Sequence, residues 1–188
     1  VSDILTPGTY IDDNINFCQT NNVTSLWVEN IKNNLYVGIS NINVISGDSH
    51  IFQYETPYSH LPNIYDTIEK YITIYNPKET IIIYNLSSSV IDNMIQYVNI
   101  KSLIRKINLN DKNDVNTQNA LKCEKQKYQQ SIYKNYFEIN DEHSFMQQFI
   151  YNDFSSQSFC FLIDFLVKLN PFLVKKISLP KIDNPVSY

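Results

Sequence analysis

The sequence predicts a mixed α/β fold in which one sheet carries helices on its faces, and three observations support this. Short segments rich in β-branched and aromatic residues, joined by turn-forming residues, occupy positions 25–56. After Pro62 the hydrophobic period changes from two residues to three and four. Beyond Asn116 the pattern is helical. Strands that lead into alternating helices and strands are typical of a sheet packed between helices.

The first three strands are predicted at SLWVENI (25–31), LYVGISNINVIS (35–46) and HIFQYET (50–56). Turn-prone residues separate them, with Lys-Asn-Asn at 32–34 and Ser-Gly-Asp at 46–48. Because strands joined by short turns pair with their neighbours, we expect an antiparallel meander.

A helix is then expected from Ile64 to Tyr75, ended by Asn76-Pro77, because the residue before proline is pushed out of the helical region. The continuous apolar run 80–84 predicts a strand buried on both faces. Serines 87–89 precede a second helical pattern, and 102–109 is predicted as a strand. The order β-β-β-α-β-α-β describes a ribonuclease-H-like fold with a mixed sheet.

The remaining chain is predicted as C-terminal helices over 118–137, 142–150 and 155–170, with a break at Asn170-Pro171. The last of these helices is apolar nearly all round, so we expect it to be covered on most sides. Both ends of the sequence lack the features of a finished domain, and we expect neighbouring segments before and after it.

Composition limits the function. The net charge is −4, from 15 basic and 19 acidic residues, which argues against a domain that holds DNA mainly through its phosphates and predicts weak DNA affinity. No apolar run reaches membrane-spanning length. Three cysteines lie far apart, and we expect reduced thiols in an intracellular protein of the cytoplasm, a viral factory, the nucleus or a mitochondrion.

Catalytic constellations are sparse. A ribonuclease-H-type nuclease holds two Mg²⁺ ions with three or four carboxylates, one of them in the middle of its first long strand. In 35–46 the interior polar residues are Ser40, Asn41 and Asn43, and an amide cannot replace a bridging carboxylate. The other acidic residues in this part of the chain look isolated, and these are Glu29, Asp66, Glu69 and Asp92.

The remaining chemical motifs are also missing from the sequence. The three histidines have no ligand spacing, and the three glycines form no phosphate-binding loop. Lysines 122, 125 and 134 make one helix basic, and we interpret them as a solvated face. The sequence therefore predicts no catalytic, cofactor-binding or metal-binding residue, and no enzyme activity.

Thr6-Pro7-Gly8-Thr9, followed by LYVGISNINVISGD and later by SFCFLIDFLVKLNPFLVKKISLPKI, resembles the MutS family of DNA mismatch-repair proteins. The stretches IEKYITIYNPKETIIIYNLS and KQKYQQSIYKNYF resemble its giant-virus and octocoral-mitochondrial branch. Asn43 stands where that family usually carries Asp.

The resemblance implies a connector domain without chemistry of its own. Residues 1–22 would be the tail of a mismatch-binding domain and a linker, 23–153 the connector, and 154–188 the start of a core domain. Thr6, Pro7, Gly8 and Thr9, and the segment 152–156, would act as hinges. No cofactor is implied for this fragment, with ATP and Mg bound elsewhere in a dimeric parent protein.

The implied partners are mismatched duplex DNA, reached through the parent protein, and a MutL-like protein. Two other functions stay open. The first is a ribonuclease-H-like metal-dependent nuclease, and the second is an interaction module unrelated to repair.

Overall fold

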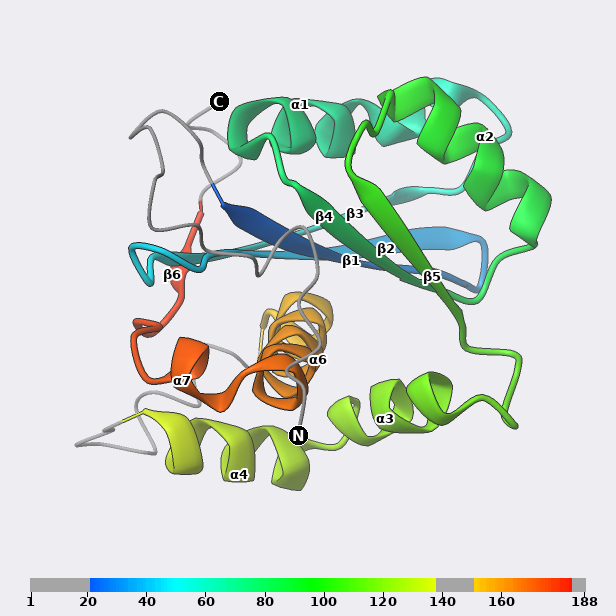
Figure 1. The fold of residues 1–188 in the computed structure, drawn as a ribbon. Helices are drawn as coiled ribbons and strands as arrows, with labels where there is room; N and C mark the ends of the chain where they lie inside the picture. The colour runs from blue at the N-terminus through cyan, green and yellow to red at the C-terminus, as the bar shows by residue number, and fades with distance from the viewer. Residues whose placement is uncertain (1–20, 138–150, 184–188) are drawn as a thin grey trace.

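The computed structural model describes residues 21–137 and 151–183 (Figure 1). A six-stranded sheet runs through the molecule in the order β5-β4-β1-β2-β3-β6. The strands are β1 (Asn22–Ile31), β2 (Asn34–Asn43), β3 (Ser49–Pro57), β4 (Glu79–Tyr84), β5 (Leu103–Asn108) and β6 (Lys181–Ile182). The helices are η1 (Pro62–Tyr65), α1 (Asp66–Tyr75), α2 (Ser88–Val98), α3 (Val115–Cys123), α4 (Gln126–Tyr136), α6 (Asp153–Leu169) and α7 (Pro171–Val174).

The predicted fold class is confirmed. Strand β1 pairs antiparallel with β2, which pairs antiparallel with β3, so the meander forms as expected. On its other side β1 pairs in parallel with β4, which pairs in parallel with β5. Helices connect these parallel strands, as parallel pairing requires. This is the mixed sheet of a ribonuclease-H-like fold, and β1 lies at its centre.

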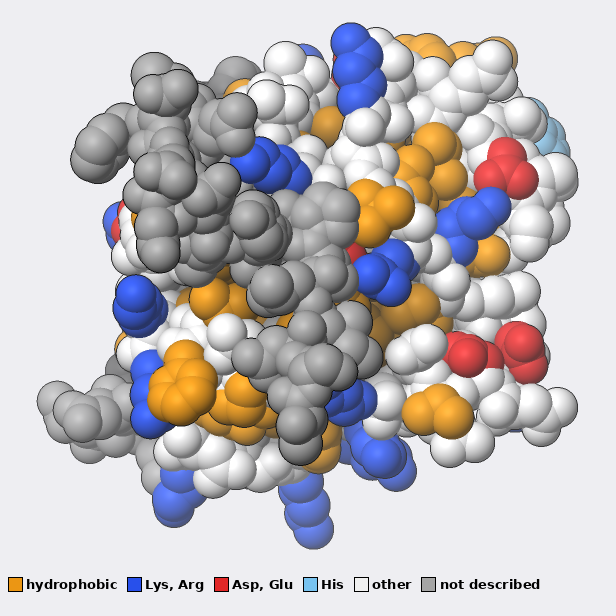
Figure 2. Space-filling view, in the orientation of Figure 1, with side chains coloured by type: hydrophobic (Ala, Val, Ile, Leu, Met, Phe, Trp, Pro, Cys, Tyr) orange, Lys and Arg blue, Asp and Glu red, His pale blue; other side chains and the backbone are white. Residues whose placement is uncertain are grey.

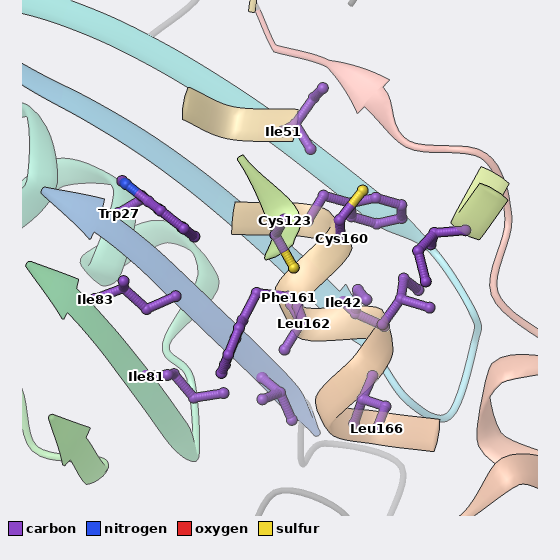
Figure 3. Close-up of a cluster of buried hydrophobic side chains, with 14 of the residues drawn as sticks. Trp27, Ile42, Ile51, Ile81, Ile83, Cys123, Cys160, Phe161, Leu162 and Leu166 are labelled. Carbon is purple, nitrogen blue, oxygen red and sulfur yellow. The ribbon is translucent and has the colours of Figure 1, made fainter. Parts of the chain in front are cut away.

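Helices cover both faces of the sheet. In Figure 1, α1 and α2 lie over one face, and α3, α4, α6 and α7 lie over the other. Each face has its own apolar core. Leu26, Ile82 and Met94 belong to the core under α1 and α2. Trp27, Ile81 and Leu162 belong to the core around α6, which Figure 3 shows in close-up. Alternate residues along β1 and β4 point to opposite faces, which is why both strands read as apolar runs.

Helix α6 packs unusually close to β2. A Cβ added at Gly38 would lie 2.1 Å from the carbonyl carbon of Phe154, so no other residue fits there without a shift. Small polar side chains line the same contact. Ser158 donates to the carbonyl of Ser25 at 2.8 Å, and its hydroxyl lies 3.0 Å from that of Ser40. The helix that was expected to be covered on most sides therefore lies directly on the centre of the sheet.

The segment 152–156, predicted as a hinge, begins this helix and is tightly held. Gln53 Oε1 accepts from the backbone N–H groups of Phe154 and Ser155, at 2.8 and 3.2 Å. A hinge here would have to break these contacts. The other predicted hinge, at residues 6–9, lies outside the described residues. The division at residues 22 and 153 stays a prediction.

Two details differ from the sequence predictions. The single helix expected over 118–137 is two helices, because the chain turns at Glu124 and Lys125. Gln129 Nε2 donates to the carbonyl of Cys123 at 2.8 Å and satisfies the end of α3. The short strand β6 was not predicted, and it pairs with β3 through only two residues. The helix expected over 142–150 falls outside the described residues.

Candidate functional site

A group of hydrogen-bonded polar residues lies where the parallel strands of the sheet end. Strands β1, β4 and β5 run in the same direction, so their carboxyl ends meet at one edge. Glu29 lies near the end of β1, Asn85 directly follows β4, and Asn110 follows β5. In open α/β sheets, ligands bind in the crevice outside this edge.

Glu29 is half-buried on the α6 side of the sheet, the side that Trp27 also faces. Its Oε1 accepts from Trp27 Nε1 at 2.5 Å, and its Oε2 accepts from Asn85 Nδ2 at 3.3 Å. Burial raises the pKa of the Glu29 carboxyl above its ordinary value, and the bond from Trp27 opposes that rise. The carboxylate is thus fixed in place but poorly solvated.

Asn85 positions this carboxylate. Its Oδ1 accepts from the backbone N–H of Asn30 at 2.8 Å, and its Nδ2 also donates to the Asn30 carbonyl at 3.3 Å. Asn110 Nδ2 donates to the Asn85 carbonyl at 2.8 Å. The amides thus join the ends of β1, β4 and β5 and fix the edge around Glu29.

A second carboxylate approaches from the helical layer. Glu124 ends α3 and is exposed. Partial burial raises its pKa, the negative charge of Glu29 raises it further, and Lys125 opposes the rise. The charge of Glu29 therefore reaches the carboxylate of Glu124. Two like charges in a partly desolvated site favour a cation between them.

Exposed lysines flank Glu124 along the chain. The exposed lysines on either side of it in the chain belong to α3, the turn after it and α4, and they are Lys122, Lys125, Lys127 and Lys134. Figure 2 shows blue side chains projecting along the lower edge of the molecule, where α3 and α4 lie. A local cluster of this kind attracts anions even though the net charge of the chain is −4.

In the part of the chain that the structure describes, neither carboxylate belongs to an ion pair. Within the described residues, ion pairs join His50 to Asp183, Arg105 to Glu79 and Lys106 to Asp92, and none includes Glu29 or Glu124. A poorly solvated carboxylate such as Glu29 is ordinarily paired or bound to a metal.

The described part of the chain has no group of three or more His, Cys, Asp or Glu side chains able to hold a metal ion. A site for two ions with several carboxylates does not fit these residues. A single ion needs fewer protein ligands, since Mg²⁺ is often bound by one or two carboxylates together with phosphate oxygens of its substrate.

The structure explains why the search of 35–46 found no acid. Ser40 and Asn41 belong to β2, which runs antiparallel to β1 and so ends at the opposite edge of the sheet. Ser40 packs against α6, and Asn41 accepts from Thr24 inside the sheet. Asn43 Oδ1 accepts from the backbone N–H groups of Ile45 and Ser46, at 3.0 and 3.1 Å, and so closes a turn. None of these residues lies at the carboxyl edge of β1.

The other acidic residues singled out from the sequence remain apart from this edge. Asp66 accepts from Tyr97 at 2.6 Å, and Asp92 pairs with Lys106 at 2.9 Å, which are contacts at the helix surface. Glu69 is exposed on α1. Among the histidines, His50 Nδ1 lies 2.9 Å from Asp183 Oδ1 and His60 lies in a surface pocket, whereas His143 is outside the described residues.

The sequence analysis named Glu29 but treated it as isolated, and it missed Asn85 and Glu124. The available signal was positional: an acidic residue near the end of one strand and an amide directly after a parallel strand. That signal needs the order of the strands, because only β1, the central strand, brings Glu29 beside Asn85.

Comparison with protein-family models returned no match, and comparison with curated proteins returned none either. Among solved structures, the chain is similar to the Fowlpox virus resolvase in its complex with substrate Holliday junction DNA. The identity is 15%, the match covers 79% of this chain and 99% of the resolvase, and the TM-score is 0.46. A likeness at this level identifies neither substrate nor active-site residues.

The matched structure is a resolvase, not a mismatch-repair protein, and the MutS prediction is therefore wrong. The same correction applies to the roles derived from it: a non-catalytic connector, mismatched DNA and a MutL-like protein as partners, a dimeric parent, and the absence of enzyme activity. The physical reason is that one kind of sheet can serve unrelated functions. Short motifs within shared strands and turns identify the sheet but not its function.

No helix in the described residues is long and apolar enough to span a membrane.

Proposed function

We propose that the chain is a divalent-cation-dependent hydrolase of nucleic-acid phosphodiester bonds, with its site at the carboxyl edge of β1 and β4. The observation that carries this proposal is the position of the Glu29 carboxylate. This carboxylate is half-buried near the end of the central strand, held by Trp27 and Asn85, and its charge reaches Glu124. The sequence analysis predicted that the chain binds no cofactor, and that prediction stays untested. We propose instead that the two carboxylates bind one divalent cation.

The charges around the pair favour a phosphate-bearing substrate. Two carboxylates alone would repel a phosphodiester, whereas one bound divalent ion neutralises their charge and removes this repulsion. The lysines of α3 and α4 then add to the attraction. A nucleic acid that approaches this edge meets positive charge on the helical side and polar amides at the strand ends.

Each residue has a distinct role in this proposal. Glu29 and Glu124 would hold the ion, which supplies charge neutralisation at the phosphate and a more acidic bound water. Asn85 is a positioning residue, because its amide fixes both Glu29 and the end of β1. Asn110, exposed beside it, is suited to donate to a phosphate oxygen once its bond to Asn85 is exchanged.

We further propose that the chain works inside the cell. Cys123 and Cys160 are buried free thiols, and burial raises the pKa of both, which suits a reducing compartment.

A cleavage assay tests the proposal. The full chain is incubated with labelled single-stranded DNA, duplex DNA, RNA–DNA hybrid and a four-way junction, with Mg²⁺, Mn²⁺ or EDTA. We expect metal-dependent cleavage of at least one substrate, and a loss of about 10²-fold or more in Glu29→Gln. Asp92→Asn, which removes a surface carboxylate of α2, is the matched control and should cleave normally. Cleavage that is equal in wild type and Glu29→Gln would overturn the assignment of the site.

A further inference from the structure

A small pocket opens on the face of the sheet opposite Glu29. Tyr58, Ser59, His60, Pro62, Tyr65, Val90 and Asn93 line it, and its volume is about 100 Å³. The rings of Tyr58 and His60 meet edge to face with centroids 5.6 Å apart. Tyr65 is buried, and burial together with Tyr58 raises its pKa to about 12, so its hydroxyl stays protonated at neutral pH.

The pocket lies at the same edge of the sheet as the acidic pair. Strand β3 runs parallel to β1, so residues after Pro57 emerge at the carboxyl edge. The backbone N–H of Tyr58 donates to the Asn33 carbonyl at 2.9 Å, which attaches the pocket to the β1–β2 turn. On the other side, Val90 is five residues beyond Asn85 in the chain. A strand of nucleic acid that crosses this edge can therefore reach both sites.

The lining of the pocket has the chemistry of a base-binding site. Tyrosine and histidine rings offer stacking surfaces, and such stacking accepts any base. Asn93 carries an amide with two donors and one acceptor oxygen, which can bond the polar edge of a base. The volume is smaller than the roughly 150 Å³ cavity that encloses a benzene ring. A planar ring can therefore enter with one edge while the rest of it stays outside.

The β1–β2 turn adds a positive charge between the two sites. Lys32 and Asn33 both have positive φ, at 49° and 67°, and form the tight turn after β1. Lys32 is exposed, and its ammonium group can contact a phosphate of a strand that passes from one face to the other.

We propose that this pocket binds a single unpaired nucleobase of the substrate. The inference rests on the proposed function, and it specifies the substrate as nucleic acid with at least one unstacked nucleotide near the scissile phosphate. Base pairing excludes an ordinary duplex base from a pocket of this shape, so single strands, branch points and flipped nucleotides are favoured.

Binding without metal separates this inference from the proposed catalysis. Fluorescence anisotropy in EDTA compares a labelled oligothymidylate with an oligonucleotide of the same length made of abasic sites. We expect the base-bearing strand to bind more tightly, and Tyr58→Ala to weaken its binding about 5- to 150-fold with little change for the abasic strand. Tyr136→Ala, a partly exposed tyrosine on α4 in the opposite layer, is the matched control and should leave both unchanged.

A second variant guards against loss of folding in the first. Val90→Phe adds a ring to the pocket without removing one, and it should weaken binding of the base-bearing strand to a similar extent. If both pocket variants bind like wild type, the inference is overturned even when Glu29→Gln abolishes cleavage. If the pocket variants lose binding while no metal-dependent cleavage is found, the pocket stands and the proposed catalysis fails.

Discussion

Gly38 in β2 and Phe154 at the start of α6 approach so closely that a Cβ on Gly38 would lie 2.1 Å from the Phe154 carbonyl carbon and 2.2 Å from its oxygen. This contact sets the distance between the sheet and the helix that covers its centre. It also places the ring of Phe154 on that of Tyr36, with centroids 5.0 Å apart. Tyr36 pairs with Glu29 across β1 and β2, so the same contact supports the strand that carries the candidate site.

The first prediction concerns Gly38. Gly38→Ala forces backbone atoms of α6 away from β2, because main-chain atoms cannot move aside as a flexible side chain does. We expect the free energy of unfolding, measured by urea denaturation, to fall by about 1–3 kcal/mol or more. Ser40→Ala on the same face removes one hydroxyl and should cost about 1 kcal/mol. Equal losses in the two variants would contradict the close packing described above.

The second prediction concerns the stability cost of Glu29. Because its pKa in the folded protein is raised, Glu29 stabilises the fold only at acidic pH, and this contribution is lost as pH rises through the raised value. Glu29→Gln should therefore unfold at a higher temperature than wild type at pH 8, and the difference should shrink toward pH 4. Glu55→Gln, at an exposed position of β3, controls for the loss of a surface charge. A wild type more stable than Glu29→Gln at pH 8 would contradict this account.

The third prediction concerns the pH dependence of cleavage. Both carboxylates must be ionised to hold a cation, and the pKa of each is raised. As the pH is lowered, activity should therefore begin to fall at a higher pH than it would with two glutamates of ordinary pKa. Trp27→Phe removes the indole N–H that stabilises the charged form of Glu29. We expect its rate profile to shift toward higher pH by up to about one unit. An unchanged profile would show that Trp27 does not stabilise the ionised carboxylate.

The fourth prediction concerns Arg105. Its guanidinium pairs with Glu79, whose side chain is fully buried at the start of β4, and lies 5.5 Å from the centre of the Phe165 ring. Arg105→Met removes this cation from a buried carboxylate, and the free energy of unfolding should fall by about 3 kcal/mol. Lys106→Met on the same strand breaks an exposed pair with Asp92 and should cost less than about 1 kcal/mol. Similar losses in both variants would contradict a structural role for the Glu79–Arg105 pair.

Much of the fold follows from local sequence signals. The strands through Leu26, Val37 and Ile82 were predicted because β-branched and aromatic residues lie between turn-forming residues. The end of α1 was predicted from Asn76-Pro77, and Asn76 indeed adopts a left-handed conformation there. These features depend on residues close in sequence, so one chain is enough to find them.

The candidate site depends on long-range pairing, and local patterns did not reveal it. Glu29 and Asn85 are 56 residues apart, and only the parallel pairing of β1 with β4 brings them together. Treating 35–46 as the first long strand directed the search for an acid to the wrong strand. The turn at Glu124 was missed for a related reason, since residues on both sides of it favour helix and tertiary packing sets the break.

Binding of Mn²⁺ to the full chain, measured by calorimetry without nucleic acid, tests the central claim most directly. The account predicts one site in wild type, binding at least tenfold weaker in Glu29→Gln and in Glu124→Gln, and unchanged binding in Asp92→Asn. Absence of any binding to wild type, or equal binding to wild type and both glutamine variants, would contradict the claim that these two carboxylates form a cation site.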